Sequence, residues 1–333
     1  MLTVYGPVIS WRLGRSLGID VVLQPKKCTF NCVYCQLGKT RVYVSSPEML
    51  TDTLVDTSQV VDDLNDILGC LNFNTIDVVT FSGTGEPTLN LKLGDIARKV
   101  REKVGGLPLA ILTNSSLFYR EDVRRNLTLF NVIVAKLDAG DDETFRSINR
   151  PADVRLNVET VIDSIKKLRK EVRGVIALQV MLLHTGCRRV SNIEGTSLRN
   201  LLKAIVEINP DQVQLEVPYR PPSESYVKPP PQRRIKFVAN ELSKVLGEDK
   251  LWVYGLHDKR GKSITWLLHK NLKEELLELL KRRPCQIQDI SASLGISPST
   301  VRGLLDKLGE LRLVVTETSE GETYYSYRNP SSN

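Results

Sequence analysis

Three of the six cysteines in this 333-residue chain lie within eight positions, at Cys28, Cys32 and Cys35. This spacing places three thiolates on one loop, whereas a structural zinc site requires four ligands and is typically built from paired Cys-x2-Cys units. A cubane iron–sulfur cluster bound by three thiolates keeps one iron open for a small molecule. The spacing therefore favours an iron–sulfur cluster with an open coordination site.

A zinc site is the alternative that the sequence leaves open. It would take its fourth ligand from a distant part of the chain, at Cys70, Cys187 or His184. We interpret Cys70, on a predicted helix, and Cys285, near a helix end, as packing residues. Cys187 follows a predicted strand and faces the expected cavity, so it is a candidate for a catalytic side chain or a ligand, although a lone cysteine is usually inert.

Short β-branched runs alternate with amphipathic patterns along the first two thirds of the chain, which predicts strands separated by helices. The predicted strands are residues 19–23, 76–81, 107–112, 132–137, 175–183 and 213–217, and the helices between them include 91–104, 154–172 and 197–208. Near-continuously apolar strands of this kind indicate a parallel sheet covered on its outer face. Because six repeats are fewer than the eight of a full barrel, we expect an α/β fold, an open and partial (βα)6 TIM-like barrel.

The polar and glycine-rich points of the sequence follow these predicted strands. They are residues 28–35, 82–87, 113–115, 138, 184–187 and 219–220. In βα barrels the chemistry takes place at the carboxyl ends of the strands, where these segments are expected to meet. Lys136 is two residues before Asp138 and points to the same face of its strand, where it can pair with a carboxylate. Lys136 is therefore the second candidate for a catalytic side chain.

The pattern changes in the last quarter of the chain. A Pro-rich connection at 221–231, a helix to about residue 246 and a strand-like 252–256 complete the first predicted domain, 1–256, and 257–267 is a polar linker. Beyond it, helices at 268–281, 287–294 and 299–311 precede a hairpin at 313–327 that turns at 319–321. Ser297 is a good N-cap, with Pro298 at the first helical position. This order predicts a winged helix-turn-helix domain over 268–333.

The segment 28–35, with the aromatic Tyr34 directly before its last cysteine, resembles the signature of radical S-adenosylmethionine (SAM) enzymes. Residues 82–87 match the glycine–glutamate–proline motif of that superfamily after the second predicted strand. The resemblance covers residues 1 to about 220. Within the superfamily, segments 5–8, 12–18, 35–38 and 81–89 are similar to the group related to wyosine-forming tRNA enzymes.

This resemblance implies a 4Fe-4S cluster on Cys28, Cys32 and Cys35, with S-adenosylmethionine on the fourth iron. It implies a broken sulfonium–carbon bond and a 5′-deoxyadenosyl radical that takes a hydrogen atom from the substrate. Such a cluster is sensitive to oxygen, so we expect a reducing cytoplasm. An electron donor such as ferredoxin or flavodoxin is implied as a partner.

The resemblance also implies the residues that bind the cofactor. They are Tyr34 near the adenine, Glu86 and the backbone of Gly83, Thr84 and Gly85 at the SAM ammonium group, and Asn114, Ser115 and Asp138 at the methionine carboxylate or the ribose. Purely structural roles remain possible for several of these residues. Gly83 and Gly85 suit a tight turn, and Glu86 suits the N-terminus of a helix. Asn114 suits a helix cap, and Asp138 suits a turn.

The distribution of charged side chains along the sequence indicates which kinds of macromolecule the chain could bind. The chain carries a formal charge of +7, whereas residues 268–333 hold nine basic and nine acidic side chains. Because duplex binding depends on positive charge, the predicted winged helix is more suited to docking a protein than to binding DNA. Arg233, Arg234 and Lys236, and the pair at 188–189, are candidates for an RNA-facing surface. Arg12 and Arg15 either reach an anionic substrate or lie in solvent.

These observations support a radical SAM enzyme that modifies a macromolecule, RNA or protein, with a tRNA base as the preferred substrate. The alternative is the same chemistry on a partner protein docked by the winged helix. A third hypothesis is a transcription regulator in which an iron–sulfur cluster controls the winged helix. The sequence has no run of about 18 uncharged apolar residues and no signal-peptide order at its start, so we expect no membrane association.

Overall fold

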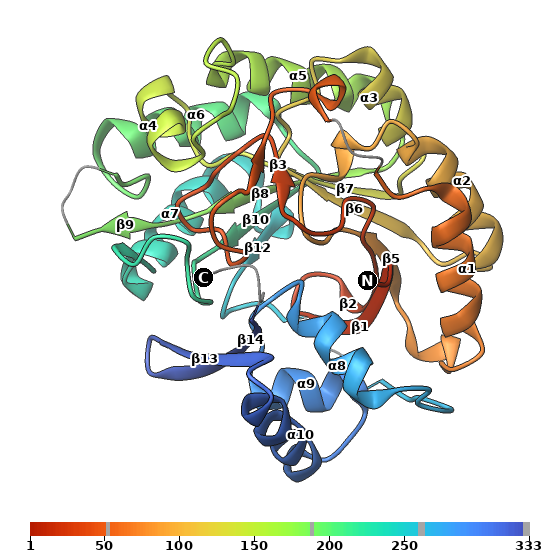
Figure 1. Cartoon of the computed structure of the whole chain (residues 1–333). Helices are drawn as coiled ribbons and strands as arrows, with labels where there is room; N and C mark the ends of the chain where they lie inside the picture. The colour runs from red at the N-terminus through yellow and green to blue at the C-terminus, as the bar shows by residue number, and fades with distance from the viewer. Residues whose placement is uncertain (51–53, 187–189, 259–263, 329–333) are drawn as a thin grey trace.

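The computed structural model describes residues 1–50, 54–186, 190–258 and 264–328. Its main sheet has eight strands in the order β1-β2-β5-β6-β7-β8-β10-β12, with β1 antiparallel to β2 and the other pairs parallel. The strands are β1 (Val4–Ser10), β2 (Gly14–Ile19), β5 (Val78–Phe81), β6 (Leu109–Thr113), β7 (Val132–Lys136), β8 (Val175–Met181), β10 (Gln212–Glu216) and β12 (Leu251–Val253). The sheet curls into the expected partial barrel (Figure 1).

The start of the barrel differs from the prediction. The predicted strand 19–23 is wrong in position, because β2 ends at Ile19 and the chain then turns. The turn forms because Asp20 Oδ1 accepts hydrogen bonds from the backbone N–H groups of Val22 and Leu23, each at 3.1 Å. The antiparallel strand β1 was not predicted, and the prediction for β8 ran two residues beyond its end.

Helices cover the outer face of the sheet (Figure 1). They are α1 (Thr57–Leu68), α2 (Leu93–Lys103), α3 (Glu121–Leu127), α4 (Asp142–Ile148), α5 (Val158–Glu171), α6 (Gly195–Ile208) and α7 (Gln232–Leu246). In α5, Asn157 caps the first turn by accepting from the N–H of Thr160, and Val161, Ile165 and Leu168 are buried against the sheet at helical spacing. None of the helices in the described part of the chain is long and apolar enough to span a membrane.

Short elements frame the loops at the open edge. Strands β3 (Lys27–Cys28) and β4 (Val42–Tyr43) pair around the cysteine loop, and β9 (His184–Thr185) pairs with β11 (Val227–Lys228). In the part of the barrel that the structure describes, four short 3-10 helices complete it: η1 (Pro47–Met49), η2 (Phe73–Thr75), η3 (Pro87–Leu89) and η4 (Glu248–Lys250).

The C-terminal part forms the predicted winged helix. It consists of α8 (Leu272–Leu280), α9 (Ile287–Leu294), α10 (Pro298–Glu310), β13 (Val314–Ser319) and β14 (Glu322–Tyr327). Ser297 caps α10 as expected, accepting from the N–H of Thr300 at 3.1 Å. The core of the winged helix includes Tyr5 and Val8 of β1, so α8 and α9 pack directly on the first strand of the barrel (Figure 1). The predicted boundaries at 256 and 268 stay predictions.

We expect the core at the end of β5 to be sensitive to truncation. Phe81 is fully buried, and its ring packs edge-on against Phe130 with centroids 5.0 Å apart. Phe81→Ala should lower the free energy of unfolding by about 3–5 kcal/mol, because the cavity cannot collapse in a packed core. Leu91→Ala, at a side chain 57% exposed, should change it by less than about 0.5 kcal/mol. Urea denaturation measures both, and equal effects would contradict this account of the core.

Candidate functional site

The three clustered cysteines lie on the loop that begins in β3, at the carboxyl edge of the sheet. Each sulfur has a nitrogen donor nearby. Lys26 Nζ lies 3.1 Å from Cys35 Sγ, Asn114 Nδ2 lies 3.5 Å from Cys28 Sγ, and Asn149 Nδ2 lies 3.7 Å from Cys32 Sγ. Hydrogen bonds to sulfur favour the thiolate form, which is the form that binds iron.

The buried thiols of Cys28 and Cys32 resist ionisation in the absence of a nearby positive charge. Burial raises the pKa of Cys28 to about 12 and that of Cys32 to about 11, and the negative charges of Glu86 and Cys35 add to these shifts. Burial opposes the charge of Lys26, but the negative charges of the Cys35 and Cys28 thiolates raise its pKa overall. Because thiolates must form before iron binds, cluster assembly at this loop releases protons.

None of the candidates for a fourth zinc ligand, Cys70, His184 and Cys187, is seen to join the cysteine loop in the described residues. Cys70 follows α1, and its thiol is 3.4 Å from the Asp66 carbonyl oxygen. His184 pairs through its backbone in β9, and Cys187 lies outside the described residues. Across 1–50, 54–186, 190–258 and 264–328, no three His, Cys, Asp or Glu side chains are grouped to hold a single metal ion.

The glycine loop after β5 is packed too closely for side chains. A Cβ atom at Gly85 would lie 2.1 Å from the Lys27 carbonyl oxygen, and one at Gly83 would lie 2.2 Å from Asp20 Cγ. Thr84 turns inward, and its N–H and Oγ1 both bond Asp20 Oδ2, at 3.1 and 3.0 Å. The glycines therefore let the loop lie against the strand that carries Cys28.

Glu86 links this loop to the end of β6. Its Oε1 accepts from Thr113 Oγ1 at 2.6 Å and from Thr88 Oγ1 at 2.7 Å, and its Oε2 accepts from the N–H of Asn114 at 2.8 Å. Burial raises the pKa of this carboxyl, and the hydrogen bonds from Thr113 and Thr88 oppose that shift. It also caps η3, which is the ordinary role that the sequence left open. Contact with the SAM ammonium group stays a prediction.

Asp138 links three further segments. Its Oδ2 accepts from Tyr34 Oη at 2.5 Å and from Asn149 Nδ2 at 2.7 Å, and its Oδ1 accepts from the N–H of Met181 at 2.8 Å. Lys136 Nζ lies 3.7 Å from Asp138 Oδ1 and 4.8 Å from the centroid of the Tyr34 ring. Lys136 thus pairs with a carboxylate, as its strand position predicted.

Two buried polar atoms beside the cysteine loop fit a bound cofactor. Within the described chain, Ser115 Oγ and Asn149 Oδ1 are buried without a hydrogen-bond partner. Ser115 also has a φ of +67°, a conformation that is costly for a residue with a side chain. Unsatisfied atoms and backbone strain of this kind are typical of sites that a ligand completes. The residues present therefore fit a cluster that carries an amino-acid ligand.

The roles of Asp20 and Asn149 were not predicted from the sequence. Asp20 directly follows β2, so the strand-end rule would have found it if that strand had been placed correctly. Asn149 follows α4, far from the cysteines in sequence, and no local pattern marks it.

A cavity of about 660 Å³ lies between the carboxyl edge of the barrel and the winged helix. The glycine loop contributes Gly83 and Gly85 to its wall. Its other lining residues include Arg12, Tyr219, Arg220 and Tyr254 from the barrel and Arg283, Asp289, Glu322 and Tyr324 from the winged helix. Arg12 thus faces a cavity, whereas Arg15 pairs with Asp77 at 2.7 Å. The participation of the winged helix in this wall was not predicted.

Comparison with known proteins decides the family. The model of the radical SAM superfamily matches residues 25–186, and that of the arsR family of bacterial regulatory proteins matches 273–316. A UPF0026 protein of Methanocaldococcus jannaschii is 30% identical over 333 residues, covering 98% of this chain and 96% of the relative. The chain belongs to the UPF0026 family of the radical SAM superfamily.

Two of the other relatives cover smaller parts of this chain. A UPF0026 protein of Synechocystis is 35% identical over 218 residues, 66% of this chain and 76% of that protein. GTP 3′,8-cyclase of Rhodococcus opacus is 30% identical over 142 residues, 42% of this chain and 36% of that protein. Membership confirms a radical SAM enzyme with an added winged helix, whose cofactors are a 4Fe-4S cluster and S-adenosylmethionine. The assignment of individual site residues stays a prediction.

Gly85→Ala tests the packing of the glycine loop. Because the new methyl group would collide with the Lys27 carbonyl oxygen, it should displace β3 and with it Cys28. We expect reconstituted iron per chain and SAM affinity both to fall, the affinity by about tenfold or more. Gly303→Ala on α10, where a Cβ meets open space, is the matched control. Iron analysis and anaerobic calorimetry measure these effects, and wild-type values for Gly85→Ala would refute the packing argument.

Proposed function

We propose that this radical SAM enzyme acts on a base of RNA, with a tRNA base as the first candidate. With the cluster and SAM bound, this site would supply the radical chemistry of the superfamily: given one electron from a donor such as ferredoxin or flavodoxin, it would remove a hydrogen atom from the substrate. The observation that carries the proposal is the lining of the large cavity, where arginines and aromatic rings stand beside the glycine loop.

The aromatic part of the wall suits a base. Tyr219 and Tyr254 stack with centroids 4.5 Å apart, and Trp11 packs edge-on against Tyr254. The Arg220 guanidinium lies 4.5 Å from the centre of the Tyr219 ring. Stacked aromatic and guanidinium groups are the features with which proteins bind unpaired bases. These side chains would orient the substrate and exclude water from it.

The arginine part of the wall suits a phosphate. In the described part of the chain, Trp11 Nε1, Arg12 Nε and Arg283 Nη2 are buried donors without a hydrogen-bond partner, and all three residues line the cavity. Arg12 also pairs with Glu216 at 3.7 Å, and Arg283 with Asp289 at 4.0 Å. Buried donors without a hydrogen bond are costly, and an acceptor-rich anion would satisfy them. The phosphate of a nucleotide has this chemistry.

Other observations agree with a nucleotide substrate. GTP 3′,8-cyclase, a partial relative, is named for a nucleotide substrate. The charge of +7 lies outside residues 268–333. Arg233 and Lys236 are exposed on α7, whereas the pair at 188–189 lies outside the described residues. We place the enzyme in the reducing cytoplasm, where both the cluster and tRNA would be found.

The second candidate is a partner protein docked by the winged helix. The zero net charge of 268–333 favours it over duplex DNA as a ligand of this domain. In this case the same cavity would receive a peptide segment, with a carboxylate in place of the phosphate.

One anaerobic experiment tests the proposal. The reconstituted protein is incubated with SAM, dithionite and tRNA from a strain that lacks the gene. We expect the tRNA to stimulate 5′-deoxyadenosine formation and one nucleoside to change mass. Arg12→Gln should reduce the stimulation, whereas Arg15→Gln should not. tRNA from the complemented strain is the control, since it is already modified.

Stimulation by a protein fraction instead of tRNA would favour the second candidate. Equal formation of 5′-deoxyadenosine with tRNA from both strains, with no nucleoside changed, would contradict the tRNA proposal.

A further inference from the structure

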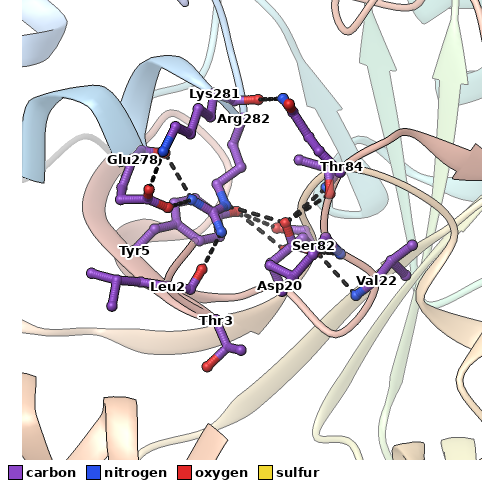
Figure 2. A network of polar contacts seen from close by, with 12 residues as sticks. Leu2, Thr3, Tyr5, Asp20, Val22, Ser82, Thr84, Glu278, Lys281 and Arg282 are labelled. Atoms are coloured by element: carbon purple, nitrogen blue, oxygen red, sulfur yellow. Dashed lines mark hydrogen bonds and ion pairs between the residues drawn. The ribbon is translucent and has the colours of Figure 1, made fainter. Parts of the chain in front are cut away.

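A buried arginine joins the winged helix to the barrel at the glycine loop (Figure 2). Arg282 follows α8, and its side chain is 1% exposed. Its guanidinium bonds the carboxylate of Glu278, the carbonyl oxygen of Leu2 and, through Nε at 3.1 Å, Asp20 Oδ2. One side chain of the winged helix thus reaches the end of strand β2.

Asp20 is the point where three segments meet. Its Oδ2 accepts from Arg282 Nε and from the N–H and Oγ1 of Thr84, while Oδ1 accepts from the backbone N–H groups of Val22 and Leu23. The carboxylate therefore holds the glycine loop, the turn after β2 and the winged helix together. Its close approach is possible because Gly83 has no side chain there.

A second path runs from the same arginine to the same loop. The Arg282 guanidinium lies 4.6 Å from the centre of the Tyr5 ring, and Tyr5 Oη lies 3.0 Å from Ser82 Oγ. Ser82 and Thr84 flank Gly83, so the arginine supports the loop from both sides (Figure 2).

Arg282 supplies the positive charge that balances the buried carboxylate of Asp20. Asp20 is 1% exposed, and Arg282 is its ion-pair partner in the described part of the chain. A buried carboxylate without a counter-charge is costly, so the segments around Asp20 would rearrange if the arginine were lost, and its bonds to Thr84 would weaken. Glu278 is also paired with Lys281, so that carboxylate keeps a partner if the arginine is lost.

We propose that Arg282 is a positioning residue for S-adenosylmethionine, through which the winged helix completes the cofactor site of the barrel. By neutralising Asp20, it keeps residues 82–86 in the shape that accepts SAM. The inference rests on the predicted SAM contact of this loop and is independent of the substrate. Because linkage is reciprocal, SAM binding in turn tightens the docking of the winged helix.

Arg282→Gln in the full-length, reconstituted protein tests the inference, with Arg302→Gln on the exposed face of α10 as the matched control. We expect Arg282→Gln to weaken SAM binding by about tenfold, to leave iron per chain unchanged, and to accelerate hydrogen exchange of 82–86 in the absence of SAM. Arg282→Lys should restore part of the affinity, since it keeps the charge. Added SAM should slow exchange in α8 of the wild type only.

The result that would overturn the inference is faster exchange confined to the winged helix with a SAM affinity like that of the wild type. If Arg282→Gln does not fold, Thr84→Val decides, because it removes one bond to Asp20 and leaves the arginine in place. It should accelerate exchange of 82–86 and weaken SAM binding, and wild-type values for both would equally refute the inference. These measurements of SAM binding and hydrogen exchange do not use tRNA. Their failure is therefore distinguishable from a failure of the proposed function.

Discussion

Three buried carboxylates hold the functional loops of this protein in place. Asp20, Glu86 and Asp138 follow β2, β5 and β7, and each is at most 2% exposed. Each accepts backbone N–H bonds, and together they reach the loop after β5, the loop after β6 and the end of β8. Because a buried charge is stable only when it is fully bonded, these groups fix the spacing of the loops that they join. The parallel sheet brings the loops to one edge, and the carboxylates determine their relative positions.

This arrangement connects the cysteine loop to the winged helix. Asn114, whose N–H bonds Glu86, also places its amide beside Cys28. Asn149, bonded to Asp138, places its amide beside Cys32. At the other end of the series, Asp20 receives Arg282 from the winged helix. The winged helix also forms part of the wall of the 660 Å³ cavity beside the glycine loop, and its basic and acidic side chains are equal in number.

The sequence was informative where chemistry depends on short-range spacing. The cysteine triplet, the glycine loop and the order of parallel strands were all predicted, because covalent spacing and hydrophobic period determine them locally. The position of β2 and the existence of β1 were missed, because Gly6, Pro7 and Gly18 break the pattern of a typical strand. The roles of Asn149 and Arg282 and the share of the winged helix in the cavity wall were beyond reach, since they depend on contacts between residues more than 100 positions apart. The structure also revealed hydrogen-bonding roles for Glu86 and Asp138 that the residue types alone left open.

The claim at the centre of this account is that Cys28, Cys32 and Cys35 bind three irons of the cluster and the fourth binds SAM. Electron–nuclear double resonance on the reduced, reconstituted protein, with SAM labelled by nitrogen-15 at its amino group, tests it most directly. The account predicts a nitrogen-15 coupling to the cluster that disappears when unlabelled SAM replaces the labelled form. A protein with its full iron content and bound SAM but no such coupling would contradict it.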